Sequence, residues 1–290
     1  MVVTNDLAGR TQRDAVDAIV AELSHGGPVE LVECRTESDL DGVLDRRAGR
    51  PLALLGGDGS LNRMLAFLWR RGEAEQCPIA LVPLGTGNDF ARGVDIPLDP
   101  VLAARLARTG QPRPVDLITD DAGGVVVNAM HVGVGADAAA NAKPLKPYLR
   151  SAAFPLGAVV AGARASGWRL RIEVDGQPLT SGRRRVLMAG LANAPSIAGG
   201  TATLAPGASV TDGQFDVVVS TAVGPLARVG YALKLVRGTH ASRSDVLRRL
   251  GQRLTISGEP FQVNADGDIS EPIRRRTWTV RPGAWRCYLP

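Results

Sequence analysis

The 290-residue sequence has few aromatic residues, three cysteines and no apolar run long enough to cross a bilayer. Aromatic side chains make up 4% of it, so Val, Leu, Ala and Ile have to fill the cores. Cys34, Cys77 and Cys287 are widely scattered, which excludes a zinc motif and a disulfide framework and fits a reducing cytoplasm. The best apolar stretch, 152–163, is too short to span and contains Pro155. We therefore expect a cytoplasmic protein, either soluble or peripheral at the inner face of the membrane.

Positive charge is in excess, with a net charge of +5 and an isoelectric point near 9.5. This balance favours anionic partners such as nucleotides, anionic lipid surfaces or nucleic acid, although an Arg- and Ala-rich proteome produces the same balance. The basic runs Arg183–Arg185 and Arg274–Arg276 are accompanied by no aromatic stacking platform, so we do not expect nucleic-acid binding. Such runs are most often solvated faces, but they could also meet an anionic membrane.

The first part of the chain alternates between short apolar strands and amphipathic helices. We expect Ser38 to cap the second helix, with Asp41 three residues further on. This alternation predicts a doubly wound α/β domain with a parallel sheet covered on both faces. The predicted strands are 2–3, 29–32, 52–55 and 79–82, and the predicted helices are 11–24, 38–47, 61–71, 88–92 and 100–108.

The pattern changes near Asp116, where strands are separated mainly by Gly and Pro turns. This half predicts an antiparallel, β-rich, sandwich-like domain. We place the domain boundaries so that residues 1–123 with 277–290 form the nucleotide-binding domain and 124–276 form the β-rich domain. The predicted strands are 125–127, 170–174, 186–191, 215–219 and 254–256, and the predicted helices are 148–165 and 226–236.

A glycine-rich turn, Gly56–Ser60, follows a predicted buried strand and opens a helix. Its glycines allow the backbone to approach a phosphate closely, and free N–H groups at a helix start favour negative charge. The Asp58 carboxylate would repel a phosphate, so we expect it to hold Mg²⁺ or a sugar hydroxyl. Ser60 is expected to cap the helix. A tight turn without a ligand is the alternative interpretation.

A second loop, 83–92, also lies after a buried strand and before a helix, with the sequence Pro-Leu-Gly-Thr-Gly-Asn-Asp-Phe-Ala-Arg. In a doubly wound sheet both loops lie at the carboxyl ends of their strands and face one crevice. Asn88 and Asp89 add an amide and a carboxylate beside a second set of backbone donors. Alternatively, these two residues simply cap a helix.

Together the two loops resemble the diacylglycerol kinase catalytic domain, in the group of soluble bacterial lipid kinases related to sphingosine and ceramide kinases. The resemblance covers nearly the whole chain, because further motifs follow in the family's order. These are 5–10, 115–117, Asn128 with 133–137, Asn193 with 199–200, 205–208, 212–216 and 264–268.

This resemblance implies an ATP-dependent kinase that transfers the γ-phosphoryl group to a diacylglycerol-like or sphingoid hydroxyl, with ATP and Mg²⁺ bound in an interdomain crevice. It implies that Asp268 is the general base, that Asp58 has a catalytic role, and that Asp212 ligates a metal in a turn that could equally be a plain Asp-Gly turn. It also implies nucleotide contacts from Asn5, Gly56, Gly57, Asp58, Gly59, Ser60, Asn62, Gly85, Thr86, Gly87, Asn88 and Asp89.

Three positions depart from the family's pattern. Asp268 replaces a Glu and therefore reaches about one methylene less far, which domain closure or the nearby Glu271 could compensate. Arg63 stands where the family has Glu, and could pair with a phosphate or displace a structural carboxylate contact. Asp6 replaces a Pro in the opening motif.

These departures keep two alternatives open: a catalytically impaired nucleotide- or lipid-binding homologue, and a kinase for a non-lipid small-molecule hydroxyl. NAD kinases and phosphofructokinases also carry Gly-Gly-Asp-Gly turns, but their other signatures are not evident. A homodimer is the default expectation for the oligomeric state.

Overall fold

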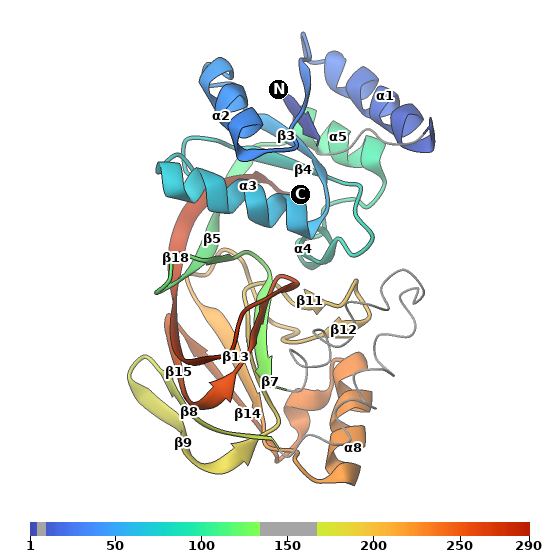
Figure 1. Cartoon of the computed structure of the whole chain (residues 1–290). Helices are drawn as coiled ribbons and strands as arrows, with labels where there is room; N and C mark the ends of the chain where they lie inside the picture. The colour runs from blue at the N-terminus through green and yellow to red at the C-terminus, as the bar shows by residue number, and fades with distance from the viewer. Residues whose placement is uncertain (5–9, 134–166) are drawn as a thin grey trace. The chain divides into compact units, whose positions relative to one another are not determined.

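The computed structural model describes residues 1–4, 10–133 and 167–290, with side chains from residue 13 onward in the second range. They form two compact units, Met1–Val115 with Gly283–Pro290 and Asp116–Pro282 (Figure 1). The sequence-based boundaries were 123/124 and 276/277. The helix predicted at 148–165 and the opening motif around Asn5 lie outside the described residues. Among the helices described, none has the length and the apolar character of a membrane span.

A parallel sheet forms the centre of the first unit, as predicted. The order of its strands places β1 between β2 and β3, so the chain moves to one edge and then returns past its starting point. That reversal is the doubly wound arrangement. The order is β2 (Leu31–Glu33), β1 (Val2–Thr4), β3 (Leu52–Gly56), β4 (Ile79–Pro83) and the end of β18 (Ile273–Tyr288), where Cys287 pairs with Ile79.

The helices of this unit are α1 (Arg10–Ser24), α2 (Glu37–Arg46), α3 (Asp58–Arg71), α4 (Asp89–Gly93) and α5 (Pro100–Thr109). Two predicted caps are wrong. Thr36 caps α2, in a capping box with Asp39, because the helix begins before Ser38. The N-cap of α3 is Gly57, so Ser60 lies within the first helical turn.

The second unit is a sandwich of antiparallel strands, which confirms the predicted β-rich domain. One sheet has the order β14 (Val246–Gly251), β13 (Phe215–Ser220), β10 (Met188–Ala192), β7 (Ala129–Gly133), β16 (Val263–Ala265) and β17 (Asp268–Ile269). The facing strands are β18, β15 (Arg253–Phe261), β8 (Trp168–Val174) and β9 (Gln177–Val186); β5 (Pro112–Asp120) pairs with β18, and β6 (Val125–Val126) pairs with β5.

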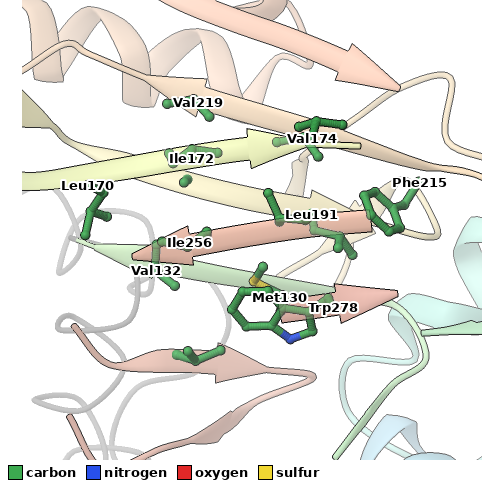
Figure 2. Packing of buried hydrophobic residues seen from close by; sticks show 14 of the residues in the cluster. Met130, Val132, Leu170, Ile172, Val174, Leu191, Phe215, Val219, Ile256 and Trp278 are labelled. Atoms are coloured by element: carbon green, nitrogen blue, oxygen red, sulfur yellow. The ribbon is translucent and has the colours of Figure 1, made fainter. Parts of the chain in front are cut away.

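Side chains from both sheets form the core of the sandwich (Figure 2). Met130 of β7 and Leu191 of β10 come from one sheet, and Ile172 of β8 and Trp278 of β18 from the other. The strand predicted over 186–191 is in fact two: β9 ends at Val186 and β10 begins at Met188, in different sheets. A continuous apolar run hides such a change of sheet, because the residues that point to either face of the strand are all buried and no alternation shows where one strand ends.

The outer face of the six-stranded sheet has a smaller core of its own. Val218 of β13 and Val246 of β14 pack there with Tyr231 of α8 (Pro225–Val236). The short strands β11 (Ser196–Ile197) and β12 (Ala202–Thr203) form a separate hairpin, and α8 contacts β12.

Candidate functional site

The two predicted glycine loops lie side by side in the first unit. β3 and β4 are neighbouring parallel strands, and Gly56 at the end of β3 is in register with Pro83 at the end of β4. The Leu84 N–H donates to the Gly56 carbonyl at 3.0 Å, which joins the starts of the two loops. The sheet therefore brings the two loops together, as the sequence predicted.

Contact between the loops requires glycine on both sides. A Cβ atom added to Gly57 would lie 2.9 Å from the Gly85 Cα, and one added to Gly85 would lie 2.6 Å from the Gly57 Cα. Gly56 is equally confined, since its added Cβ would lie 2.6 Å from the Ser60 Oγ. These glycines are explained by the packing of the protein itself, without any ligand.

Asn88 closes the second loop upon itself. Its Oδ1 accepts the Gly85 N–H at 3.1 Å, and its Nδ2 donates to the Gly85 carbonyl at 2.7 Å. The residue is buried and adopts the left-handed conformation, with φ 52° and ψ 43°. An Asn tolerates this backbone better than most residues. Asn88 therefore shapes the loop backbone, and its amide is engaged by the loop itself.

The Asp58 carboxylate connects the first loop to the second. Its Oδ2 accepts the Asp89 N–H at 3.0 Å and its Oδ1 accepts the Phe90 N–H at 2.9 Å. These amides are the first two of α4, where a negative charge is favourable. The sequence predicted Mg²⁺ or a sugar hydroxyl as the partner of Asp58. In the structure each of its oxygens holds the start of α4, so Asp58 positions the second loop, and its binding of Mg²⁺ stays a prediction.

The open side of the first loop is at Gly59 and Ser60. A Cβ added to Gly59 would meet no atom within 4 Å, so protein packing does not explain this glycine. The N-cap residue Gly57 supplies no side-chain hydrogen bond to the first turn of α3. Backbone donors of that turn, next to a residue without a side chain, form a surface that an anion can approach closely.

Two arginines flank the loops. The Arg92 Nε donates to the Gly87 carbonyl at 3.1 Å and so braces the second loop. Arg63, the residue that departs from the family's pattern, is exposed one turn into α3, and its Nε donates to the Gly59 carbonyl at 3.4 Å. This contact places the positive charge of Arg63 beside Gly59. Of the other predicted loop residues, Thr86 is exposed, and Asn62 and Asp89 are partly buried.

In the second unit, Asp266 anchors the hairpin that carries the predicted general base. Its Oδ2 accepts the Val127 N–H at 2.6 Å, and its Oδ1 accepts the N–H groups of Asn128 and Ala129, each at 3.0 Å. Its φ of 48° and that of 97° at Gly267 make a tight two-residue turn between β16 and β17. Three backbone donors thus fix this turn against the first residue of β7 and the two residues before it.

Asp268 is the first residue of β17 and is exposed, directly after this turn. It pairs with Ala265 of β16, and the Asn264 Oδ1 accepts the Gly267 N–H at 3.0 Å beneath the turn. Glu271, the predicted substitute, is exposed beyond the end of β17. Asp268 therefore has a rigid backbone and a solvent-accessible carboxylate, which are suitable for a proton acceptor.

Asp212 lies in an exposed turn before β13. Its Oδ1 accepts the Gln214 N–H at 2.9 Å, as in an ordinary Asx turn. The buried Asp116 holds this turn from below, because its Oδ2 accepts the Gly213 N–H at 2.7 Å. Metal ligation by Asp212 stays a prediction.

In the part of the chain that the structure describes, no group of three or more His, Cys, Asp or Glu side chains could hold a metal ion without other ligands. Mg²⁺ in phosphate sites usually needs one or two carboxylates, with phosphates and water supplying the other ligands. The carboxylates of Asp58 and Asp89 at the loops fit that requirement.

Comparisons with known proteins agree with this arrangement. The family model for the diacylglycerol kinase catalytic domain matches residues 1–119, and that for the YegS C-terminal NAD kinase beta sandwich-like domain matches residues 128–288. The chain belongs to the diacylglycerol kinase family. A relative from Pseudomonas aeruginosa (strain UCBPP-PA14), named "Probable lipid kinase YegS-like", is 35% identical over 280 residues, covering 94% of this chain and 88% of the relative.

Two further family members have lower sequence identity. A "Diacylglycerol kinase" from Bacillus subtilis is 28% identical over 223 residues, covering 73% of this chain and 69% of that protein. The crystal structure of a diacylglycerol kinase from Bacillus anthracis superposes with a TM-score of 0.78 at 19% identity, covering 100% of this chain and 96% of the other. The superposition shows that the fold is shared.

The sequence did not reveal the roles of the residues that hold the turns and loops of the second unit in place. Asp266 and Asp116 were seen as parts of motifs, without their anchoring roles. The Asn193 Nδ2 donates to the Val127 carbonyl at 2.9 Å, and the Asn128 Nδ2 donates to the Ser196 carbonyl at 2.6 Å. Both amides are buried. A lone polar residue within an apolar run was the available signal, since such a group requires a partner when buried.

Proposed function

We propose that this protein is an ATP-dependent lipid kinase that transfers the γ-phosphoryl group of ATP to a diacylglycerol-like or sphingoid hydroxyl. One observation carries the proposal: Asp58 and the Gly57–Gly85 contact lock two glycine loops together at the carboxyl ends of β3 and β4. Ligands of open α/β sheets bind at that edge. The family relationship supports the lipid acceptor, because the relatives are named lipid kinases.

The nucleotide phosphates would bind at the first turn of α3. Gly59 leaves room there for close approach, and the backbone donors of that turn supply positive partial charge. Arg63 beside Gly59 adds a full positive charge, which favours phosphate pairing over the alternative that it merely displaces a carboxylate. Asp58 and Asp89 would bind Mg²⁺ together with ATP. The Mg²⁺ would neutralise charge on the transferred phosphoryl group.

Asp268 would accept the proton of the lipid hydroxyl. The hydroxyl oxygen then forms a bond to the γ-phosphorus, the bond to the bridging oxygen breaks, and ADP leaves. Its exposed carboxylate and the rigid turn made by Asp266 support this role. Asp58 would contribute by fixing the position of the second loop.

Phosphorylation of a lipid by the pure protein tests the proposal. The protein is incubated with radiolabelled ATP, Mg²⁺ and mixed vesicles that contain diacylglycerol, ceramide and sphingosine, and the products are identified by mass spectrometry. Parallel reactions contain NAD or sugar phosphates. We expect a labelled lipid with the natural protein and a greatly reduced amount with Asp268→Asn.

The Bacillus subtilis relative, assayed alongside, shows whether the conditions support catalysis. If it labels lipid and this protein does not, the lipid-kinase proposal is wrong. Binding of ATP without any labelled product would then favour the catalytically impaired homologue, and a labelled water-soluble acceptor would favour the non-lipid kinase.

A further inference from the structure

Helix α8 of the second unit, labelled in Figure 1, carries a stripe of exposed apolar side chains. Leu226 is 89% exposed, Val229 45%, Leu233 56% and Val236 48%. Their spacing of three, four and three residues places them on one face of the helix. Single exposed apolar residues are common on protein surfaces, but four on one helical face suggest a surface for interaction.

The opposite face of α8 already has its place in the fold. Tyr231 is buried in the outer core of the six-stranded sheet, and Ala227 and Leu235 pack against that core. These three residues follow one another at intervals of four, so they form a second apolar face. The exposed stripe is therefore not required to hold α8 on its sheet.

Charge around the stripe has one sign. No acidic residue occurs between 221 and 244, whereas this segment contains Arg228, Lys234, Arg237 and Arg243. On the helix, Lys234 and Arg237 lie along one border of the stripe and Arg228 lies beyond the other. Arg243 pairs with Asp245 at 2.5 Å, and so contributes less net charge. An apolar stripe bordered by basic residues is complementary to a surface that is both apolar and anionic.

A second copy of the chain is a poor match for this surface. In a two-fold dimer the same patch meets itself, so Lys234 and Arg237 of each copy would approach basic residues of the other. No acidic residue of the 221–244 segment would offset that repulsion. An anionic bilayer supplies both the apolar layer and the negative charge.

We propose that the α8 face formed by Leu226, Val229, Leu233 and Val236 docks on an anionic lipid bilayer, with Lys234 and Arg237 against the headgroups. The inference rests on the proposed function, because a kinase of a membrane lipid has to reach its substrate in the bilayer. It also differs from the sequence-based expectation, which placed membrane contact at the two arginine runs.

Those runs are partly engaged elsewhere. Arg276 pairs with Asp120 at 2.9 Å, and Arg185 donates to the Gly167 carbonyl at 2.6 Å. Arg183 and Arg184 are exposed on β9, but no exposed large apolar side chain is found on that strand. They supply charge without an apolar contact, and so make a suitable charge-matched control.

Vesicle binding without ATP tests the docking surface. Co-sedimentation is measured with vesicles of phosphatidylcholine containing increasing phosphatidylserine. We expect Leu226→Gln with Leu233→Gln to weaken binding about a hundredfold, roughly tenfold for each leucine removed from the bilayer. Lys234→Gln with Arg237→Gln should weaken it about 25-fold, roughly fivefold for each charge, and only at low salt.

Two matched variants serve as controls. Leu98→Gln with Leu102→Gln removes two exposed leucines of the first unit, which are 39% and 48% exposed. Arg183→Gln with Arg184→Gln removes two exposed charges from β9. Both should keep the binding of the natural protein within about threefold. Circular dichroism verifies that each variant is folded.

The proposal is overturned if the leucine variant of α8 binds vesicles as the natural protein does, or if the Arg183 and Arg184 variant alone loses binding. It is also overturned if the α8 leucine variant converts a dimer into a monomer in analytical ultracentrifugation while vesicle binding persists. Kinase activity on a short-chain, water-soluble acceptor separates the two proposals, because it does not require membrane binding. If the natural protein lacks this activity, the kinase function is contradicted, and the vesicle-binding result still stands.

Discussion

Asp58 in the first unit and Asp266 in the second occupy comparable turns but anchor different structures. Each precedes a glycine, and each uses both carboxylate oxygens to accept backbone N–H groups from another segment. Asp58 accepts two N–H groups at the start of α4, in the next βα unit of the chain. Asp266 accepts three from residues 137 to 139 positions earlier, at the start of β7 and just before it.

The comparison shows that the acidic residue of a glycine turn can be a structural anchor, while residues next to it are the ones that a ligand can reach. Next to Asp58 lies Gly59, which leaves open space, and two residues after Asp266 lies the exposed Asp268. Asp58 shapes a surface for phosphate, whereas Asp266 orients a carboxylate. Substitutions of the anchors and of the groups that they position should therefore have different effects.

The largest expected effect is on catalysis by Asp268. Asp268→Asn removes the proton acceptor but keeps the shape of the residue. We expect kcat for lipid phosphorylation to fall about 10²- to 10⁴-fold, because this is the usual contribution of a general base. Steady-state kinetics with saturating ATP measure it.

The same variant should leave stability unchanged, because the Asp268 side chain is exposed. Urea unfolding provides the control. A variant that keeps more than half of the natural kcat would show that Asp268 is not the base, and Glu271→Gln would then be tested next.

The anchors themselves should affect stability. Asp266→Asn turns one acceptor oxygen into a donor that faces the Val127 N–H, and removes the charge from the other two bonds. We expect a loss of about 3 kcal/mol in the second unit, since each hydrogen bond to a charged group contributes about 1.5 to 3 kcal/mol. Asn also tolerates the left-handed backbone of this position.

Asp58→Asn is the matched variant in the first unit and breaks two such bonds, so a loss of about 2 kcal/mol is expected. Amide hydrogen exchange distinguishes the two sites: Val127–Ala129 should exchange faster in one variant, and Asp89 and Phe90 in the other. Equal exchange at both sites in both variants would contradict the assignment of separate anchors.

A pH dependence of stability is expected near the Asp266 anchor. His131 of β7 pairs with Asn264 across the strands, and burial lowers its pKa from 6.5 to about 4. The folded protein therefore favours neutral His131, whereas the unfolded chain binds a proton below pH 6.5. Stability is fully present above that pH and falls as pH drops towards 4, by up to about 3 kcal/mol.

Urea unfolding at intervals between pH 7 and pH 4 measures this effect, and His131→Gln should flatten the curve. If the two curves have the same slope, His131 is not the group responsible.

The smallest effects distinguish the glycines. Gly57→Ala places a Cβ 2.9 Å from the Gly85 Cα, so we expect a loss of about 1 to 3 kcal/mol. Gly59→Ala meets no atom within 4 Å and lies in helix α3, so stability should rise by about 0.5 to 1 kcal/mol. The dissociation constant of ATP should nevertheless increase in Gly59→Ala, as measured by calorimetry. Unchanged ATP affinity would place the phosphates elsewhere.

The sequence predicted the existence of most elements but often not their ends. The buried strands β3 and β4 were recognisable because continuous apolar runs between turns are typical of parallel strands. The start of α3 was predicted at residue 61 because the glycine-rich composition of 56–60 is typical of a turn, whereas the helix already begins at Asp58. Short strands such as β17, with only two residues, have too few residues to show a period.

For the site, the sequence by itself determined that two glycine loops follow consecutive buried strands and that an Asp-Gly turn precedes Asp268, because these features depend on local spacing. Only the tertiary structure decided what Asp58 and Asp266 do, since their partners are amides from distant segments that any residue type can supply. Backbone donors leave no mark in a sequence. The same holds for α8, whose two apolar faces look alike in sequence until packing buries one of them and leaves the other exposed.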